Sequence, residues 1–530
     1  MNKPSDDTGR IARSAGTVSI AVMCSRVLGL VREQVFAGMF GAGYAYDAFV
    51  VAFRIPNLLR DLFAEGALSA AFVTVFTDYD TNRGEQATWK LASNVMVFLA
   101  IVLSLVTLAG CLFADQILML LAPDFALVTG KMELTRKLTV IMFPFLIFIS
   151  LAAVAMGILN TRGRFFVPAM ASSYFNLGSI VGGVALALLL PRFGQPAIVG
   201  MAFGTLIGGL LQLAMQLPTL ARTGFTFRPH LDLTDPGLKR ILFLMLPAVI
   251  GLSATQINIF VNTNFAASCA EGSVSWLNYA FRFVQFPIGV FGVAISIATL
   301  PVISRHAATR DMASLKTAYS SALTMAFCLT IPATVGLIIL AEPIIRIIYQ
   351  HGAFTAYDTL MTGQTLALYS LGLFAYASVK IMVPVFYALN DTKYPVIGSF
   401  LAVGANIIII LLTIDRFQHQ AIALSTSCTM TINFLFLSFV LHRKLAGYPL
   451  GYLFTGLGKV LLAAAAMGGY LYLIESSLAA WAAQGFSRQV VALLFSIATG
   501  TALYGTLLHL LRLQELRFLT EKILSRLRGR

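Results

Sequence analysis

Long runs of apolar residues restrict the fold of this 530-residue chain more than any other feature. Residues 95–112, 177–190 and 405–414 are three of the most apolar stretches. A helix needs about 20 such residues to cross the hydrocarbon core of a bilayer. Only 11% of the residues are charged, whereas soluble domains carry about 25%. The chain is therefore predicted to be an all-α, multi-pass membrane protein without a separate soluble domain.

The apolar runs predict fourteen transmembrane helices. We place them near residues 14–40, 44–77, 92–114, 136–160, 166–190, 196–220, 238–265, 274–304, 317–341, 358–388, 395–414, 420–442, 457–475 and 488–512. The first is interpreted as a retained helix and not as a cleaved signal peptide, because no clear small-residue cleavage site follows it.

Basic residues are unevenly distributed between the predicted loops. If the N-terminus is cytoplasmic, 24 Lys and Arg residues fall on the cytoplasmic side, 7 fall on the opposite side and six fall within helices. This asymmetry predicts that both termini are cytoplasmic. The net charge of +14 then reflects topology. Anionic membrane lipids are its expected partner, and a nucleic-acid partner is not expected.

The chain also resembles itself at an offset of about 228–230 residues. AFRIPN at 52–57 matches AFRFVQ at 280–285, and APDFA at 122–126 matches HGAFT at 351–355 with Phe125 over Phe354. Three further weak matches keep the same order. The repeat unit contains six helices, so both copies enter the membrane from the same side as a parallel pseudo-twofold repeat. We predict an N-lobe over 1–223, a C-lobe over 224–444, and two added helices with a basic tail over 445–530.

Five charged residues lie within one predicted helix, in the sequence DAFVVAFRIPNLLRDLFAEGALSA at 47–70. At about 100° per residue, four of them share a narrow stripe, namely Asp47, Arg54, Asp61 and Glu65, and Arg60 lies off it. A charge at the bilayer centre costs about 3 kcal/mol or more, so a shared stripe indicates an aqueous cavity. Snorkelling at the helix ends is the alternative for the three carboxylates, but it suits Arg54 poorly.

The second predicted helix also contains a proline, and three other predicted helices contain basic residues. Pro56 predicts a bend in the second helix. Arg26 and Arg32 lie in the first helix, where Glu33 is a local partner for Arg32, and Arg282 in the eighth helix is the repeat-equivalent of Arg54. Lys380 in the tenth helix either joins this set or snorkels. Because the planar guanidinium suits phosphate, these residues predict a cationic cavity for an anionic substrate.

The sequence contains no pattern typical of catalysis. HExxH, GxSxG, Walker and Rossmann motifs are absent, so an enzyme is not expected, and neither is a cofactor. The cysteines, Cys24, Cys111, Cys269, Cys328 and Cys428, are scattered without metal-ligand spacing, which predicts neither a metal site nor a disulfide framework.

The stretch SRVLGLVREQVFAGMFGAGYAYDAFVVAFRIPNLLRDLFAEGALSAAFVTVF at 25–76 resembles the signature of the MurJ (MviN) lipid II flippases, which belong to the multidrug/oligosaccharidyl-lipid/polysaccharide exporter superfamily. GSVSWLNYAFRFVQFPIGVFGVAISIATLPVIS at 272–304 and YQHGAFTAYDT at 349–359 resemble further family segments. The resemblance implies two lobes around a central cavity. It also implies export of an undecaprenyl-pyrophosphate-linked peptidoglycan precursor to the outer leaflet of the bacterial inner membrane by alternating access.

The resemblance assigns functional positions as well. They correspond to Arg26, Arg32, Asp47, Arg60, Glu65 and Arg282 in this chain. Arg60 is therefore also a candidate site residue, although it lies off the stripe. One departure is evident: many family members have acidic residues beside the eighth-helix arginine, where this chain has Phe281 and Gln285. Ion coupling through that helix is therefore not expected.

Three alternatives stay open at the sequence level. A flippase for another polyprenyl-pyrophosphate glycan shares the same chemistry, and an ion-coupled small-molecule antiporter would use Asp47 and Glu65. A scaffold for cell-wall synthesis proteins would keep the fold without the charged cavity. Any dependence on membrane potential or on a coupling ion is a further expectation that the sequence leaves undecided.

Overall fold

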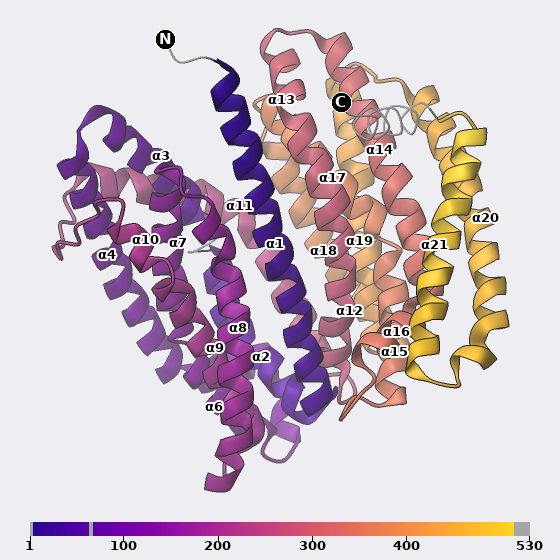
Figure 1. Ribbon diagram of the computed structural model, residues 1–530, viewed down its shortest axis with the longest axis horizontal. Helices are drawn as coiled ribbons and strands as arrows, with labels where there is room; N and C mark the ends of the chain where they lie inside the picture. Colours follow the sequence, from indigo (N-terminus) through magenta and orange to yellow (C-terminus); the bar gives the residue numbers. More distant parts are fainter. Residues whose placement is uncertain (1–3, 63–66, 514–530) are drawn as a thin grey trace. The chain divides into compact units, whose positions relative to one another are not determined.

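The computed structural model describes residues 4–62 and 67–513, and this part of the chain is helical without a β-strand (Figure 1). Its contacts divide the chain into two compact units, Met1–Val274 and Ser275–Arg530. The all-α fold predicted from the apolar runs is confirmed.

The first unit is a succession of helices. They are α1 (Pro4–Phe40), α2 (Tyr44–Arg60), α3 (Ala67–Asn82), α4 (Glu85–Leu112), α5 (Ala114–Leu121), η2 (Pro123–Leu127), α6 (Lys131–Met142), α7 (Phe145–Thr161), α8 (Phe166–Leu189), η3 (Leu190–Phe193), α9 (Ala197–Ala214), α10 (Leu217–Ala221) and α11 (Pro236–Ala267).

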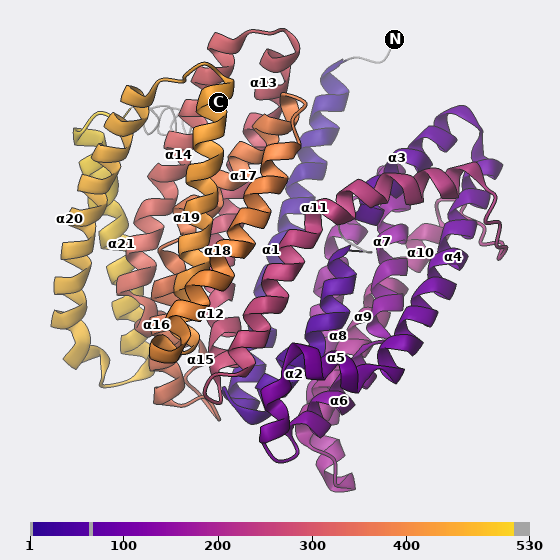
Figure 2. The same cartoon turned by 180° about the vertical axis from the view of Figure 1, so that it is seen from behind.

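The second unit is built in the same way (Figure 2). Its helices are α12 (Ser273–Pro287), which begins at the boundary, the π-helical segment η4 (Ile288–Val293), α13 (Ala294–Ala308), α14 (Met312–Ile339), α15 (Ala341–Tyr349), α16 (Ala356–Ser370), α17 (Leu373–Ala388), α18 (Lys393–Phe417), α19 (His419–Lys444), α20 (Leu450–Ala482) and α21 (Phe486–Leu510).

Ten helices in the described part of the chain are long and apolar enough to cross a membrane, and two bent pairs, within α11 and across α16–α17, bring the number to twelve. All twelve coincide with predicted spans. The other two predicted spans, 14–40 and 44–77, correspond to the charge-bearing α1 and to the α2–α3 segment. The count of fourteen is compatible with this set and stays a prediction.

Apolar side chains fill the interior of the first unit. One core joins α3, α4, α7 and α11 through residues such as Phe72, Val95, Ile158 and Ile241, each at most 1% exposed. Helix α11 thus packs with the first unit, whereas the repeat in the sequence assigns it to the second lobe. The lobe boundaries at 1–223, 224–444 and 445–530 remain predictions.

The second unit has its own core around α14, α17, α19, α20 and α21. The Tyr504 hydroxyl of α21 donates to the Cys328 carbonyl of α14 at 2.7 Å, which fixes an added helix to the bundle. The start of α12 is fixed too, since Trp276 Nε1 donates to Asp358 at 2.9 Å. Asp358 also forms a capping box with Thr355 at the start of α16. A buried carboxylate in the YQHGAFTAYDT segment therefore joins α12 to α16.

Local structure repeats between the two units. Short helices follow α4 and α14, namely α5 and α15, and the aligned Phe125 and Phe354 are both buried. The turns after α7 and α17 also match: Arg164 N donates to Leu159 O at 2.8 Å, and Asp391 N donates to Phe386 O at 2.9 Å. These bonds belong to Schellman-type helix ends. The internal repeat is therefore expressed in matching elements.

Candidate functional site

The charged residues of the first helix begin the candidate site. Arg26 is exposed on α1. Arg32 forms an ion pair with Glu33 at 2.8 Å, and its guanidinium lies 5.3 Å from the centre of the Phe175 ring of α8. Glu33 is 3% exposed and accepts a hydrogen bond from the Tyr46 hydroxyl at 2.7 Å. The local Arg32–Glu33 pair considered in the sequence is present, and it ties α1 to α2.

Asp47 occupies the first turn of α2 and is 1% exposed. Its Oδ2 accepts from Lys131 Nζ of α6 at 3.1 Å and from the backbone N–H of Gly272 at 2.9 Å. The Lys131 ammonium lies 4.2 Å from the centre of the Phe125 ring. We call Asp47, Lys131 and Gly272 the α2 clasp. It fixes α2 both to α6 and to the segment that connects α11 with α12.

A second contact joins the same elements. Glu271 Oε1 accepts from Tyr44 N, the first residue of α2, at 3.1 Å, and the Tyr44 hydroxyl donates to Thr129 O at 3.2 Å. Beside these contacts lies a cavity of about 200 Å³. Its lining residues are Asp47, Asp124, Phe125, Leu127, Val128, Lys131 and those from Ala266 to Glu271. The end of α2 that bears Asp47 is therefore a charged, partly hollow junction.

The other end of α2 holds the remaining charges of the stripe. The helix continues through the buried Pro56 to Arg60, and Arg54 is half-buried. Arg60 pairs with Asp61 at 2.9 Å, and Gln256 of α11 donates to Asp61 at 3.4 Å. Arg60, predicted off the stripe, thus shares a contact with a stripe residue. Glu65 lies outside the described residues.

The second unit carries the other two predicted cations. Arg282 on α12 and Lys380 on α17 are both exposed. The Phe281 ring packs edge-on to Tyr369 at 5.3 Å between ring centres, whereas Gln285 is exposed. Phe281, which stands where many family members have an acidic residue, therefore contributes to packing within this unit. The cationic cavity that the sequence predicts around Arg54 and Arg282 remains a prediction.

Two residues that contact the start of α2 were not predicted from the sequence. Lys131 reads as an ordinary loop cation and Glu271 as a loop acid, yet both contact the start of α2. The only available signal was that Lys131 follows the repeated APDFA segment, whose Phe125 covers it. In the described ranges, no group of three or more His, Cys, Asp or Glu residues is placed to hold a metal ion. None of the five cysteines, all of which lie within the described ranges, forms a disulfide.

The fold and its charged α1–α2 segment define a class, that of multi-pass helical transporters. A multidrug resistance MATE family transporter of the MOP superfamily, in its inward-facing conformation, has the same fold. It gives a TM-score of 0.68 at 16% identity over 82% of this chain and 98% of that chain. The solved inward closed conformation of lipid II flippase MurJ gives a TM-score of 0.74 at 29% identity, over 92% and 98%.

The particular family follows from the sequence comparisons. The family model described as lipid II flippase MurJ matches residues 36–492. A probable lipid II flippase MurJ of Vibrio cholerae serotype O1 is 34% identical over 97% of this chain and 98% of its own length. The lipid II flippase MurJ of Burkholderia cenocepacia is 34% identical over 82% and 84%. The chain belongs to the lipid II flippase MurJ family, which confirms the resemblance of residues 25–76.

Proposed function

We propose that this protein is a lipid II flippase, and not an enzyme, that moves the undecaprenyl-pyrophosphate-linked disaccharide-peptide from the inner to the outer leaflet of the bacterial inner membrane. The observation that carries this proposal is the family match over residues 36–492. The run of arginines along α1 and α2 agrees with it, because a pyrophosphate needs cations with several directed donors. Both termini are assigned to the cytoplasm on the charge asymmetry of the loops.

The proposed substrate site is cationic. Arg26, Arg32, Arg54, Arg60 and Arg282, with Lys380, would bind the pyrophosphate, while the sugar and peptide occupy the aqueous cavity and the polyprenyl tail stays in lipid. No cofactor is assigned to this step. Membrane lipids and cell-wall synthesis proteins are the further partners proposed.

The carboxylates are assigned to gating. Asp47 holds the α11–α12 connection on α2 through Gly272 N at 2.9 Å, so its release would remove one of the two contacts that hold that connection. Asp61 contacts Arg60 and Gln256 at the opposite end of α2. Glu65 is assigned to the same role by resemblance alone. Alternating access would then proceed by making and breaking such contacts on one helix.

Substrate binding in nanodiscs tests the proposal. Lipid II, undecaprenyl pyrophosphate and an unrelated lipid-linked sugar would be compared on wild type, Arg54→Ala and Arg282→Ala. We expect lipid II to bind most tightly, and each substitution to weaken its binding about tenfold or more, since a charge-assisted contact contributes about 1.5–3 kcal/mol. Arg222→Ala, in an exposed loop, is the matched control and should bind like wild type.

Two outcomes would change the assignment. Equal binding of all pyrophosphate lipids would keep the cationic site and remove the selectivity for lipid II. Binding that neither Arg54→Ala nor Arg282→Ala reduces would place the pyrophosphate elsewhere.

A further inference from the structure

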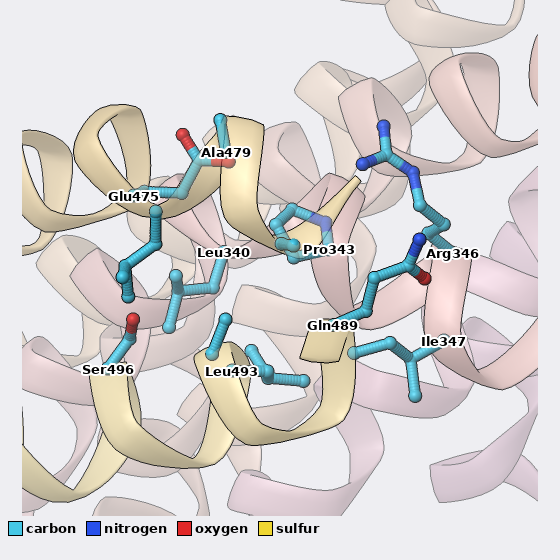
Figure 3. A pocket seen from close by; sticks show the side chains of 12 residues that line it. Leu340, Pro343, Arg346, Ile347, Glu475, Ala479, Gln489, Leu493 and Ser496 are labelled. Carbon is cyan, nitrogen blue, oxygen red and sulfur yellow. The ribbon is translucent and has the colours of Figure 1, made fainter. Parts of the chain in front are cut away.

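A separate cavity of about 70 Å³ lies in the second unit, between α15, α20 and α21 (Figure 3). It is lined by Leu340, Pro343, Arg346, Ile347, Glu475, Leu478, Ala479, Ala482, Gln489, Ala492, Leu493 and Ser496. This is well below the roughly 300–1,000 Å³ of a cavity that encloses a whole small ligand. An occupant would therefore place a short piece of chain inside and leave the rest outside.

The floor of this cavity is apolar. Leu340, Pro343 and Leu493 lie between its two flanks in Figure 3. Helix α15 is strongly amphipathic, with Ile345 and Tyr349 buried against the unit, so it fits a helix at a membrane surface. The floor suits the upper part of an acyl chain.

The rim of the cavity is polar and carries both signs of charge. Glu475 lies on one flank in Figure 3, and Arg346 and Gln489 lie on the other. Arg346 forms an ion pair with Glu342 on its own helix, which engages only part of its guanidinium. Within the described part of the chain, the Glu475 carboxylate makes no hydrogen bond or ion pair with protein.

The depth of Glu475 places this rim at the membrane interface. Residues 460–474 of α20, between Lys459 and Glu475, are free of charge, and these two charges lie about 24 Å apart along the helix. Such a spacing approaches the thickness of the hydrocarbon core, so the two residues mark opposite interfaces. A carboxylate at that depth requires a cation or water.

We propose that this cavity binds a zwitterionic, amine-bearing glycerophospholipid, such as phosphatidylethanolamine. The lipid phosphate accepts hydrogen bonds from Arg346 and Gln489, and the lipid ammonium pairs with Glu475. The upper part of one acyl chain lies on Leu340, Pro343 and Leu493. A lipid of this class supplies the anion, the cation and the apolar chain together. The leaflet that it occupies is the outer one in the orientation proposed above.

Competition between lipids tests this site. The full-length protein, purified in detergent, would be incubated with equal amounts of phosphatidylethanolamine and phosphatidylglycerol, and the bound lipids counted by native mass spectrometry. We expect wild type to prefer phosphatidylethanolamine. Glu475→Gln should lower the ratio of bound phosphatidylethanolamine to phosphatidylglycerol about two- to fivefold, the size expected for a partly exposed ion pair.

Two further variants sharpen the result. Asp415→Asn removes an exposed carboxylate at the end of α18 and should leave the ratio unchanged. Ala479→Trp fills the cavity and should reduce the binding of both lipids. An unchanged ratio in Glu475→Gln, or a wild type that prefers phosphatidylglycerol, would overturn the proposal. Displacement of phosphatidylethanolamine by a polyprenyl phosphate at low concentration would also overturn it and assign the cavity to a polyprenyl chain.

Discussion

The charges that share one stripe of α2 have different immediate partners. Asp47 contacts a lysine of α6, and Asp61 contacts Arg60 and α11. Pairing of this kind removes much of the cost of burying a charge. The proposed cationic cavity therefore depends on Arg26, which is exposed. It depends also on the guanidinium N–H groups of the other arginines that remain after pairing with nearby carboxylates.

The Asp47–Lys131 pair gives a prediction at the level of single residues. Asp47→Asn would leave the Lys131 ammonium, 2% exposed, without its carboxylate. Breaking a buried pair from one side costs about 3–5 kcal/mol, so we expect a clear fall in the unfolding temperature in detergent. Asp47→Asn/Lys131→Met, which removes both charges, should regain part of that loss.

The matched control is Asp415→Asn, which neutralises an exposed carboxylate on α18 and should unfold like wild type. If Asp47→Asn also unfolds like wild type, the pair contributes nothing to stability, and Asp47 acts only in gating or binding.

The sequence predicted that charged residues cluster on α2, but it did not predict their partners. The periodicity of α2 singles out Asp47 without any alignment. It cannot show that Lys131, 84 positions away, faces that carboxylate, because the pairing depends on how α6 packs on α2. The same holds for Glu271, which reaches the start of α2 from another segment.

Among the elements, α8 and α9 form the most closely packed pair of the first unit. Glycines allow the approach: a Cβ on Gly204 would lie 2.5 Å from the Cα of Gly183, and one on Gly200 would lie 2.2 Å from the backbone N of Ala187. Small residues at such crossings let membrane helices associate through backbone contact. This hairpin provides the surface on which α1, with Arg32, packs.

Substitution of one of these glycines tests the packing. Gly204→Ala should separate α8 from α9 and cost about 1–3 kcal/mol, the usual effect of overpacking, measured as a lower unfolding temperature. Gly251→Ala in α11 is the matched control, because its Cβ would meet nothing within 4 Å. Equal stability of the two variants would show that the contact is loose.

Elements were predictable where an apolar run was long enough to span a bilayer. The twelve spans in the described part of the chain all fall on predicted ones. The short helices α5 and α15 were missed, since eight or nine residues cannot cross a membrane and resemble a loop in a search for spans. Within the predicted 44–77 span, the structure describes α2 as far as Arg60 and α3 from Ala67 onward.

For the whole molecule, we propose the membrane potential as the driving force, because the proposed substrate site is cationic. One elementary charge moved across 100 mV corresponds to about 2.3 kcal/mol. An inside-negative potential favours outward movement of an anion and the return of an empty cationic site. In proteoliposomes that contain a potassium ionophore, replacing the potassium gradient by equal potassium on both sides removes the diffusion potential and should slow lipid II flipping several-fold. A flipping rate that does not change would refute this coupling.

The N-terminus of helix α2 is capped by a residue from outside the helix. Gly43 at its N-cap has no side chain to accept from the first N–H, and Glu271, 227 positions away, does so instead. The helix end is thus a shared structure, complete only while the α11–α12 connection lies against it. If that connection departs, water must replace the carboxylate at the positive end of the helix dipole. The first turn of α2 would then differ between a state with the connection in place and a state without it.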